Sequence, residues 1–314
     1  MPWFNLKFYI SLSYCLPSMI LYTLLMITLI RNWKDFKSGF FKIVIADYFF
    51  NLLTFLNSFL AIRLPNGTCK TCLLSEYFGG MPEGVDFPKI DVFWDVSFFL
   101  YLANAPFQYS MVVLMSLNRV TSMFFFFNNE KIWKYLFPLS LLTIILLTVC
   151  SCRTIISTSP FYRYSPSMDM YKFISTTNFI PAYNNILLFL AISSILTVLL
   201  NLVSVVKLKM QQQKLTVPER NLLLIAIFSS FVQCFAAGNT FFVPTSRTDL
   251  SFWFDVAMFI LPFSSDLLTI GQPYILLIFS SKVRKAFMKM FWNRKPRVSK
   301  NGPDSVSRSI KIIF

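Results

Sequence analysis

The chain has 314 residues, of which 55% are hydrophobic, 18% are aromatic and only 14% are charged. A soluble domain carries about 25% charged residues, so this composition excludes a water-soluble globular protein, which would have no way to cover so much apolar surface. The formal net charge of +15 is explained below by membrane topology and does not require nucleic-acid binding.

Seven apolar segments follow one another along the chain. Each is long enough, at about 1.5 Å per helical residue, to cross about 30 Å of hydrocarbon. Their length and their lack of strict alternation predict helices and not the strands of a barrel. The segments cover residues 8–30, 40–62, 93–120, 135–156, 186–206, 222–243 and 252–279. The predicted fold class is an all-α membrane protein, a seven-transmembrane helix bundle that forms one domain over residues 1–292.

The distribution of Lys and Arg predicts which side each loop faces, because basic loops are retained on the cytoplasmic side. With the N-terminus outside, 21 of the 29 basic residues lie in inner segments and eight, among them Arg63, lie in outer ones. Without the C-terminal tail the inner side still leads by 11 to eight. We therefore expect the N-terminus outside, the C-terminus in the cytosol, and long, polar outer loops at 63–92 and 157–185.

Glycosylation and disulfide chemistry both belong to the outer side in this topology. Asn66-Gly67-Thr68 is an N-x-S/T sequon in the first outer loop, so Asn66 is a candidate glycosylation site. It lies close to the membrane, which leaves its occupancy open. All six cysteines map to the outer loops or the outer half of the bundle, away from the reducing cytosol.

The first outer loop holds a C-x-x-C pattern at Cys69 and Cys72. A single such pattern in a chain without His favours a disulfide over a zinc site, and the sequence predicts no metal and no cofactor. We expect Cys69 or Cys72 to pair with Cys150 or Cys152 at the outer end of the fourth span. The sequence leaves the connectivity open.

Polar side chains recur at helical spacing in three spans, so each of these spans presents a polar stripe. The stripes are Asp47, Asn51, Thr54 and Ser58 in the second span, Ser97, Tyr101, Asn104 and Gln108 in the third, and Asp255, Asp266 and Thr269 in the seventh. Because a charge inside the membrane costs at least about 2.5 kcal/mol, we expect the stripes to meet in the bundle interior.

These stripes have two interpretations. Their residues either form hydrogen bonds that hold the helices together, worth about 0.6 kcal/mol each in membranes, or they line a ligand pocket. The pocket candidates are Tyr101, Asn104, Gln108, Asp255 and Asp266, and the candidates for an interior polar network are Asp47, Asn51 and Thr54. Asp266, near the middle of its span, is the leading candidate for pocket or switch chemistry. A cavity otherwise lined by Phe and Tyr would suit a small, partly apolar ligand.

After the seventh span the chain becomes basic. Residues 282–292 predict an amphipathic helix in the inner leaflet, because apolar and basic side chains fall on opposite faces. The apolar face has Val283, Ala286, Phe287, Met290 and Phe291, and the basic face has Lys282, Lys285 and Lys289. Residues 293–314 predict a disordered cytoplasmic tail.

Five runs of sequence carry a resemblance to a known family: LIRNWKDFKSGFFK at 29–42, DYFFNLLT at 47–54, RLP at 63–65, LNR at 117–119 and GQPYIL at 271–276. Over about residues 8–291 the chain resembles the nematode serpentine receptor class gamma chemoreceptors. The resemblance implies a G-protein-coupled chemosensory receptor in the plasma membrane of a sensory neuron. Its implied partners are a small-molecule ligand, a heterotrimeric G protein and the lipid bilayer.

Asn118 and Arg119 are candidates for the G-protein side. They stand where rhodopsin-like receptors carry an acidic residue followed by Arg, so here no neighbouring carboxylate can hold the Arg. Arg119 has two interpretations: it inserts toward a G protein, or it extends to lipid phosphates. The Gln272-Pro273-Tyr274 run keeps the proline kink of such receptors but moves the tyrosine.

The sequence is compatible with two functions. The first is the chemosensory receptor, and the alternative is a small-molecule or ion transporter or channel of the plasma membrane. Many transporters have internal repeats and glycine-interrupted helices, whereas this chain has eight Gly in all and shows no repeat. Ligand-evoked signals that persist when G-protein exchange is blocked would favour transport. The chain has no His, no phosphate-binding glycine loop and no G-x-S-x-G elbow, so no enzymatic activity is predicted.

Overall fold

A computed structural model describes residues 6–79, 92–125, 128–153, 160–165, 169–175, 180–210, 217–245 and 263–292. These residues are mostly helical. The elements are α1 (Leu6–Arg31), α2 (Trp33–Phe36), α3 (Gly39–Ser58), the π-helical turn η1 (Phe59–Arg63), α4 (Leu64–Asn66), α5 (Ser75–Gly79), α6 (Val92–Phe124), α7 (Asn129–Cys152), β1 (Pro160–Ser165), β2 (Met170–Ser175), α8 (Ile180–Met210), α9 (Val217–Thr245), α11 (Gln272–Phe279) and α12 (Ser281–Trp292).

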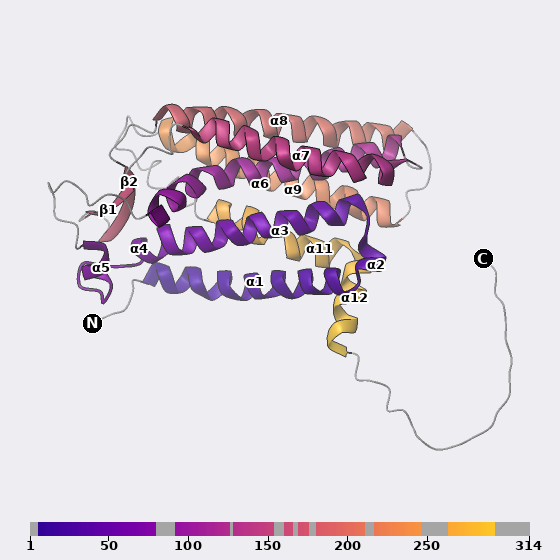
Figure 1. The fold of residues 1–314 in the computed structure, drawn as a ribbon. Helices are drawn as coiled ribbons and strands as arrows, with labels where there is room; N and C mark the ends of the chain where they lie inside the picture. Colours follow the sequence, from indigo (N-terminus) through magenta and orange to yellow (C-terminus); the bar gives the residue numbers. More distant parts are fainter. Residues whose placement is uncertain are drawn as a thin grey trace, which may run out of the picture.

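The long helices lie side by side in an elongated bundle (Figure 1). The β1–β2 hairpin, α4 and α5 gather at one end of the bundle, which we call the hairpin end. The opposite end carries α2 and α12, and we call it the α12 end.

Six helices among the described residues are long and apolar enough to cross a membrane. They cover Phe8–Arg31, Gly39–Asn66, Phe93–Phe124, Asn129–Cys152, Pro181–Met210 and Leu223–Phe241. Six of the seven predicted spans thus correspond to suitable helices. Of the predicted span at 252–279, residues 252–262 lie outside the described part of the chain, and residues 263–270 and α11 are helical.

The bundle is organised around α6. In the apolar stretch of α6, 72% of the residues are buried, against 17% in α7. The outward faces of α7 and α8 carry large exposed apolar side chains such as Leu139, Leu146, Leu188 and Ile195. An exposed apolar surface of this extent is compatible with a lipid environment and not with water.

Gly271 and Pro273 lie at the junction of the helical residues 263–270 and α11. Gly271 keeps helical backbone angles (φ −73°, ψ −30°), and its N–H bonds to the Leu267 carbonyl at 3.1 Å. A Cβ atom at this position would lie 2.3 Å from the same carbonyl oxygen, so a larger residue would force the backbone to shift. Pro273 follows at the start of α11 and has no N–H with which to continue the helical hydrogen bonds.

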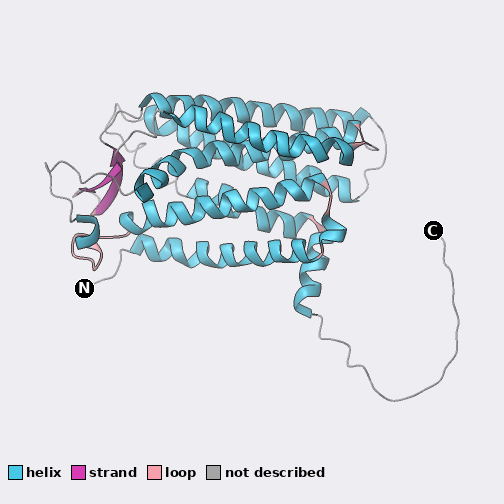
Figure 2. Cartoon of the chain, viewed as in Figure 1, coloured by secondary structure: helices cyan, strands magenta, loops and turns pink. Residues whose placement is uncertain are grey.

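The connection between α7 and α8 contains a β-hairpin, which is not among the predicted elements. β1 and β2 pair antiparallel from Pro160 with Ser175 to Ser165 with Met170, and Figure 2 draws the strands in magenta. Tyr162 and Tyr171 pack with Phe78 in a small aromatic cluster. Tyr162 and Tyr164 alternate with Arg163, which is the local signal for a strand.

α12 contacts the segment between α1 and α3. The Lys282 ammonium donates a hydrogen bond to the carbonyl oxygen of Asp35 and lies 5.1 Å from the centre of the Phe36 ring. The Thr28 hydroxyl contacts the Met290 sulfur at 3.3 Å, and Val283 is fully buried. Of the apolar stripe predicted for 282–292, Val283 is thus buried and Met290 contacts α1. The predicted tail at 293–314 lies outside the described residues.

Candidate functional site

A buried ion pair lies toward the hairpin end. Arg63, the last residue of η1, donates from Nη2 to the Asp266 Oδ1 of the helical segment 263–270. The side chains are only 14% and 7% exposed. A charge taken out of water is tolerated when it is both paired and hydrogen-bonded, so the surroundings of this pair decide whether it is stable.

α1 supplies those surroundings. The Tyr14 hydroxyl donates to Asp266 Oδ2, and the Cys15 thiol lies 3.7 Å from the same oxygen. Arg63 Nη1 donates to the Ser11 hydroxyl and to the Cys15 sulfur, at 2.9 Å. We call these five residues the Arg63–Asp266 cluster. Each charged group in it has its counter-charge and further hydrogen bonds.

The π-helical turn brings Arg63 into the bundle. The apolar pattern predicts that the second span ends at Ile62 and that Arg63 belongs to the loop after it, whereas the helix runs on through η1 and α4 to Asn66. A π-helical turn holds more residues than an α-helical one and so changes the direction of the side chains that follow, and such turns are frequent at functional sites. Nothing in the local sequence marks this turn, which is why periodicity does not find Arg63.

A second polar network crosses the bundle interior. Asp47 Oδ2 accepts hydrogen bonds from the Tyr22 hydroxyl at 3.2 Å and from Asn51 Nδ2 at 2.8 Å. Gln108 Nε2 donates to Asn51 Oδ1 at 2.7 Å and to the Thr269 hydroxyl at 3.0 Å. The network joins α1, α3, α6 and the segment 263–270, so the three predicted stripes do come together. Tyr22 is the member that the sequence analysis misses.

Other residues of the stripes lie outside this network. Thr54 is buried but hydrogen-bonds its own helix, at the Phe50 carbonyl. Asn104 is buried, whereas the Tyr101 side chain is 43% exposed. Asp255 lies outside the described residues.

A cavity of about 150 Å³ lies at the α12 end. Its polar lining comprises Ser38, Asn118, Arg119, Ser122 and Asn129. Arg119 and Asn118 are only 6% and 4% exposed, and the Asn118 Nδ2 atom has no hydrogen-bond partner among the described residues. The Arg119 side chain is therefore folded inward and is not extended toward lipid phosphates.

Gly39 allows the helices to meet beside this cavity. A Cβ atom at Gly39 would come within 2.9 Å of Trp133 Cβ and 3.0 Å of Asn118 Nδ2. Trp133 in turn is buried and donates its indole N–H to the Thr121 hydroxyl at 2.7 Å. Any larger side chain at position 39 would displace one of these groups.

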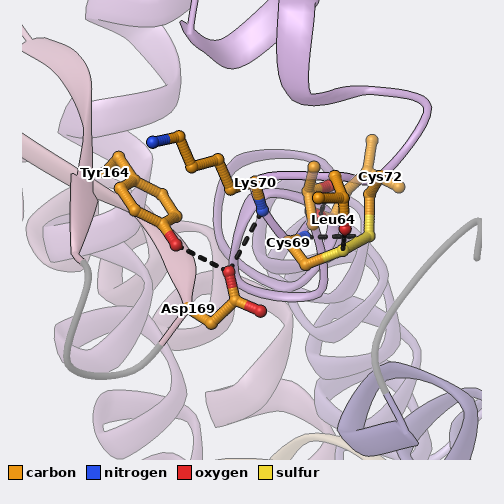
Figure 3. Close-up of a disulfide and its surroundings, with 8 residues drawn as sticks. Leu64, Cys69, Lys70, Cys72, Tyr164 and Asp169 are labelled. Atoms are coloured by element: carbon orange, nitrogen blue, oxygen red, sulfur yellow. Dashed lines mark hydrogen bonds between the residues drawn. A yellow bond between two sulfur atoms is a disulfide. The ribbon is translucent and has the colours of Figure 1, made fainter.

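The C-x-x-C turn, the hairpin and η1 are connected at the hairpin end. The backbone N–H of Lys70 and the Tyr164 hydroxyl donate to Asp169 Oδ1 at 3.1 and 2.7 Å, as Figure 3 shows. The Tyr162 hydroxyl donates to the Ala61 carbonyl inside η1 at 3.3 Å. These hydrogen bonds hold the hairpin against the turn that positions Arg63.

The hydrogen-bond donors of this contact influence the ionisation of Asp169. The hydrogen bond from Tyr164, and then the one from the Lys70 amide, stabilise the ionised carboxylate and lower the pKa of Asp169 below its ordinary value. Asp169 itself adopts a positive φ of 46°, which Asp tolerates better than most residues because its short side chain can bond locally. The hairpin is thus tied to the C-x-x-C turn by an ionised group.

Comparison with known proteins gives the same family as the sequence runs. Residues 8–287 match the family model for "Srg family chemoreceptor". The chain belongs to the Srg family. It is 26% identical over 283 residues to serpentine receptor class gamma-31 of Caenorhabditis elegans, covering 87% of this chain and 88% of that protein. It is 23% identical over 299 residues to serpentine receptor class gamma-2 of the same organism, covering 90% and 84%. The predicted family is confirmed, and the chain is a chemosensory serpentine receptor with multiple membrane-spanning helices.

The disulfide of this Srg receptor differs from the predicted one. Cys69 and Cys72 are bonded to each other (Figure 3), and Cys150 and Cys152 are free thiols. The predicted bond from Cys69 or Cys72 to Cys150 or Cys152 is therefore wrong for this structure. The Cys72 N–H bonds to the Cys69 carbonyl at 3.0 Å, and this tight turn brings the two Cα atoms to 5.0 Å, a separation that suits a disulfide.

The glycosylation sequon of the Srg receptor is folded into the end of a helix. Asn66 ends α4, and Thr68 is fully buried with its hydroxyl bonded to the Leu64 carbonyl at 2.8 Å. Modification at Asn66 stays a prediction. Among the described residues no group of three or more His, Cys, Asp or Glu could hold a metal ion.

Proposed function

We propose that this Srg receptor is G-protein-coupled, that it binds a small extracellular ligand among its helices near the hairpin end, and that it signals to a heterotrimeric G protein at the α12 end. The observation that carries the proposal is one helical segment, 263–270, which contributes to both buried polar groups. Asp266 belongs to the Arg63–Asp266 cluster, and Thr269 receives the hydrogen bond of Gln108 in the Asp47 network.

These shared contacts provide a physical route for coupling. Asp266 and Thr269 are three residues apart on one helix, so a shift of this segment changes both groups at once. A ligand changes receptor conformation only if it binds one conformation better than the other. A ligand that alters the contacts of Asp266 would therefore also alter the link from Thr269 through Gln108 to α3.

The cytoplasmic side of the proposal rests on Arg119. Its side chain lies in a cavity at the α12 end, beside Asn118, whose Nδ2 atom is unpartnered among the described residues. The Arg119 guanidinium and the Asn118 amide can donate hydrogen bonds to carbonyl or carboxylate groups of a protein segment that inserts into this cavity. Asn118 carries no charge, so activation does not require Arg119 to break an ion pair with the residue before it.

A chemical screen in heterologous cells tests this function. Cells expressing the receptor are exposed to a panel of small odorants and metabolites, and activation of each G-protein class is read from separation of its subunits. We expect at least one compound to activate a G protein, and we expect Arg119→Leu to abolish the response at equal surface level. Lys34→Gln, which removes an exposed charge of α2, serves as the control. Responses that persist when nucleotide exchange is blocked would support transport instead.

A further inference from the structure

We propose that the Arg63–Asp266 cluster recognises a zwitterionic ligand of the amino-acid class, whose carboxylate binds Arg63 and whose ammonium group binds Asp266. The proposal names the ligand class of the receptor and rests on the proposed receptor function. In the structure the two side chains satisfy each other, so the receptor itself occupies both halves of the site until a ligand enters between them.

The charges of the cluster exclude ligands that carry a single charge. A carboxylate alone would pair with Arg63 but would leave Asp266 without its counter-charge, and an amine alone would do the same to Arg63. An unpaired buried charge weakens binding by about 100-fold or more. A ligand with both groups leaves neither Arg63 nor Asp266 unpaired.

Neutral ligands are excluded for a related reason. An uncharged group can offer hydrogen bonds, but it does not replace the attraction between a guanidinium and a carboxylate that are 14% and 7% exposed. It would therefore leave the pair closed. A zwitterion exchanges one ion pair for two, so it can separate Arg63 from Asp266 and leave neither charge unpaired.

The neighbours of the pair already orient both charged groups. Ser11 and Cys15 accept hydrogen bonds from Arg63 Nη1, so its Nη2 is directed toward Asp266. Tyr14 donates to the Asp266 Oδ2 atom, which leaves Oδ1 as the oxygen that an ammonium group would meet. Such preorganisation reduces the ordering cost of binding.

Aromatic side chains next to the cluster indicate the kind of amino acid. The Tyr14 ring stacks on Phe263 with centroids 6.2 Å apart and planes 24° apart, and the Phe263 side chain is 44% exposed. Cys15 belongs to a buried apolar cluster with Met19, Phe55 and Ile270. The partly exposed Phe263 ring suits contact with an apolar or aromatic side chain.

Binding to the purified receptor in lipid nanodiscs, without G protein, tests the proposal. The probes are L-phenylalanine, L-leucine and L-methionine, each compared with compounds that lack one charged group. For phenylalanine these are phenethylamine and 3-phenylpropionate. We expect a calorimetric or thermal-shift signal for at least one amino acid, and an affinity about 100-fold or more lower for its amine and its acid. Equal affinity for either single-charge analogue, or no binding of any probe, would overturn the proposal.

Variants test whether the amino acid binds at the Arg63–Asp266 cluster. The double variant Arg63→Met/Asp266→Leu removes both charges without leaving either buried alone, so it should fold and lose the binding of the amino acid. Arg163→Gln removes an exposed positive charge of the hairpin and should bind as the wild type does. Retained binding in the folded double variant would contradict the assignment. Activation of a G protein by other compounds, with no binding of these probes, would refute the ligand class and leave the receptor function standing.

Discussion

Arg63 and Asp266 carry opposite charges and are largely shielded from water, so an unpaired charge at either position is unfavourable. Removing one member of a buried pair typically costs about 3–5 kcal/mol, and we expect roughly 3 kcal/mol for Asp266→Asn because the Arg63 side chain remains 14% exposed and can turn toward water. The double variant Arg63→Met/Asp266→Leu should recover most of the loss. Thermal unfolding in detergent of the purified wild type, Arg63→Met, Asp266→Leu and the double variant measures this cycle, and single effects that simply add in the double variant would contradict the pairing.

The same residue should matter to signalling. We expect Asp266→Asn to reach the cell surface and to change basal or ligand-evoked G-protein activation, because the amide keeps the size of the side chain but removes the charge that holds Arg63 to the segment 263–270. Glu76→Gln, at an exposed position of the hairpin end, is the matched control. An Asp266→Asn receptor at normal surface level with an unchanged basal level and dose response would show that the carboxylate has only a structural role.

Among the elements, the hairpin is held to the C-x-x-C turn by a contact that depends on pH. The hydrogen bonds from Tyr164 and from the Lys70 amide lower the pKa of Asp169 below its ordinary 3.8. A lowered pKa adds stability above the ordinary value, and this stability is lost as the pH falls through the lowered value. We expect the Lys70 amide to lose protection from hydrogen exchange, relative to its intrinsic rate, below about pH 3.8.

An amide variant separates this effect from general acid unfolding. Asp169→Asn should reduce the protection of the Lys70 amide at neutral pH and make it insensitive to acid over the same interval. Protection that follows the same pH curve in both proteins would show that Asp169 is not the group responsible.

The spacing of polar residues predicts much of the interior, but not the details that depend on local backbone geometry. Asp47 and Asn51 lie one helical turn apart in the second span, and Asn104 and Gln108 lie one turn apart in the third, so the helical period places each pair on one face. Arg63 depends on a π-helical turn that no residue pattern announces. The Cys69–Cys72 bond depends on a four-residue turn that competes with longer-range pairings.

For the whole molecule, the charge distribution predicts the N-terminus outside and the C-terminus in the cytosol. The hairpin end would then be extracellular and the α12 end cytoplasmic. Epitope tags at the two termini, tested for antibody access in intact and permeabilised cells, measure this orientation. Access to the C-terminal tag in intact cells would reverse the positions assigned to the ligand and the G protein.

The central claim is that the receptor catalyses nucleotide exchange on a G protein. The most direct measurement uses the purified receptor in nanodiscs with purified heterotrimers, an activating compound from the cell screen, and the Arg119→Leu variant as comparison. Our account predicts that the compound accelerates GTP binding to one G-protein class and that Arg119→Leu removes the acceleration while the compound still binds. The absence of any acceleration, together with flux of ions or of the compound through the receptor in proteoliposomes, would contradict it.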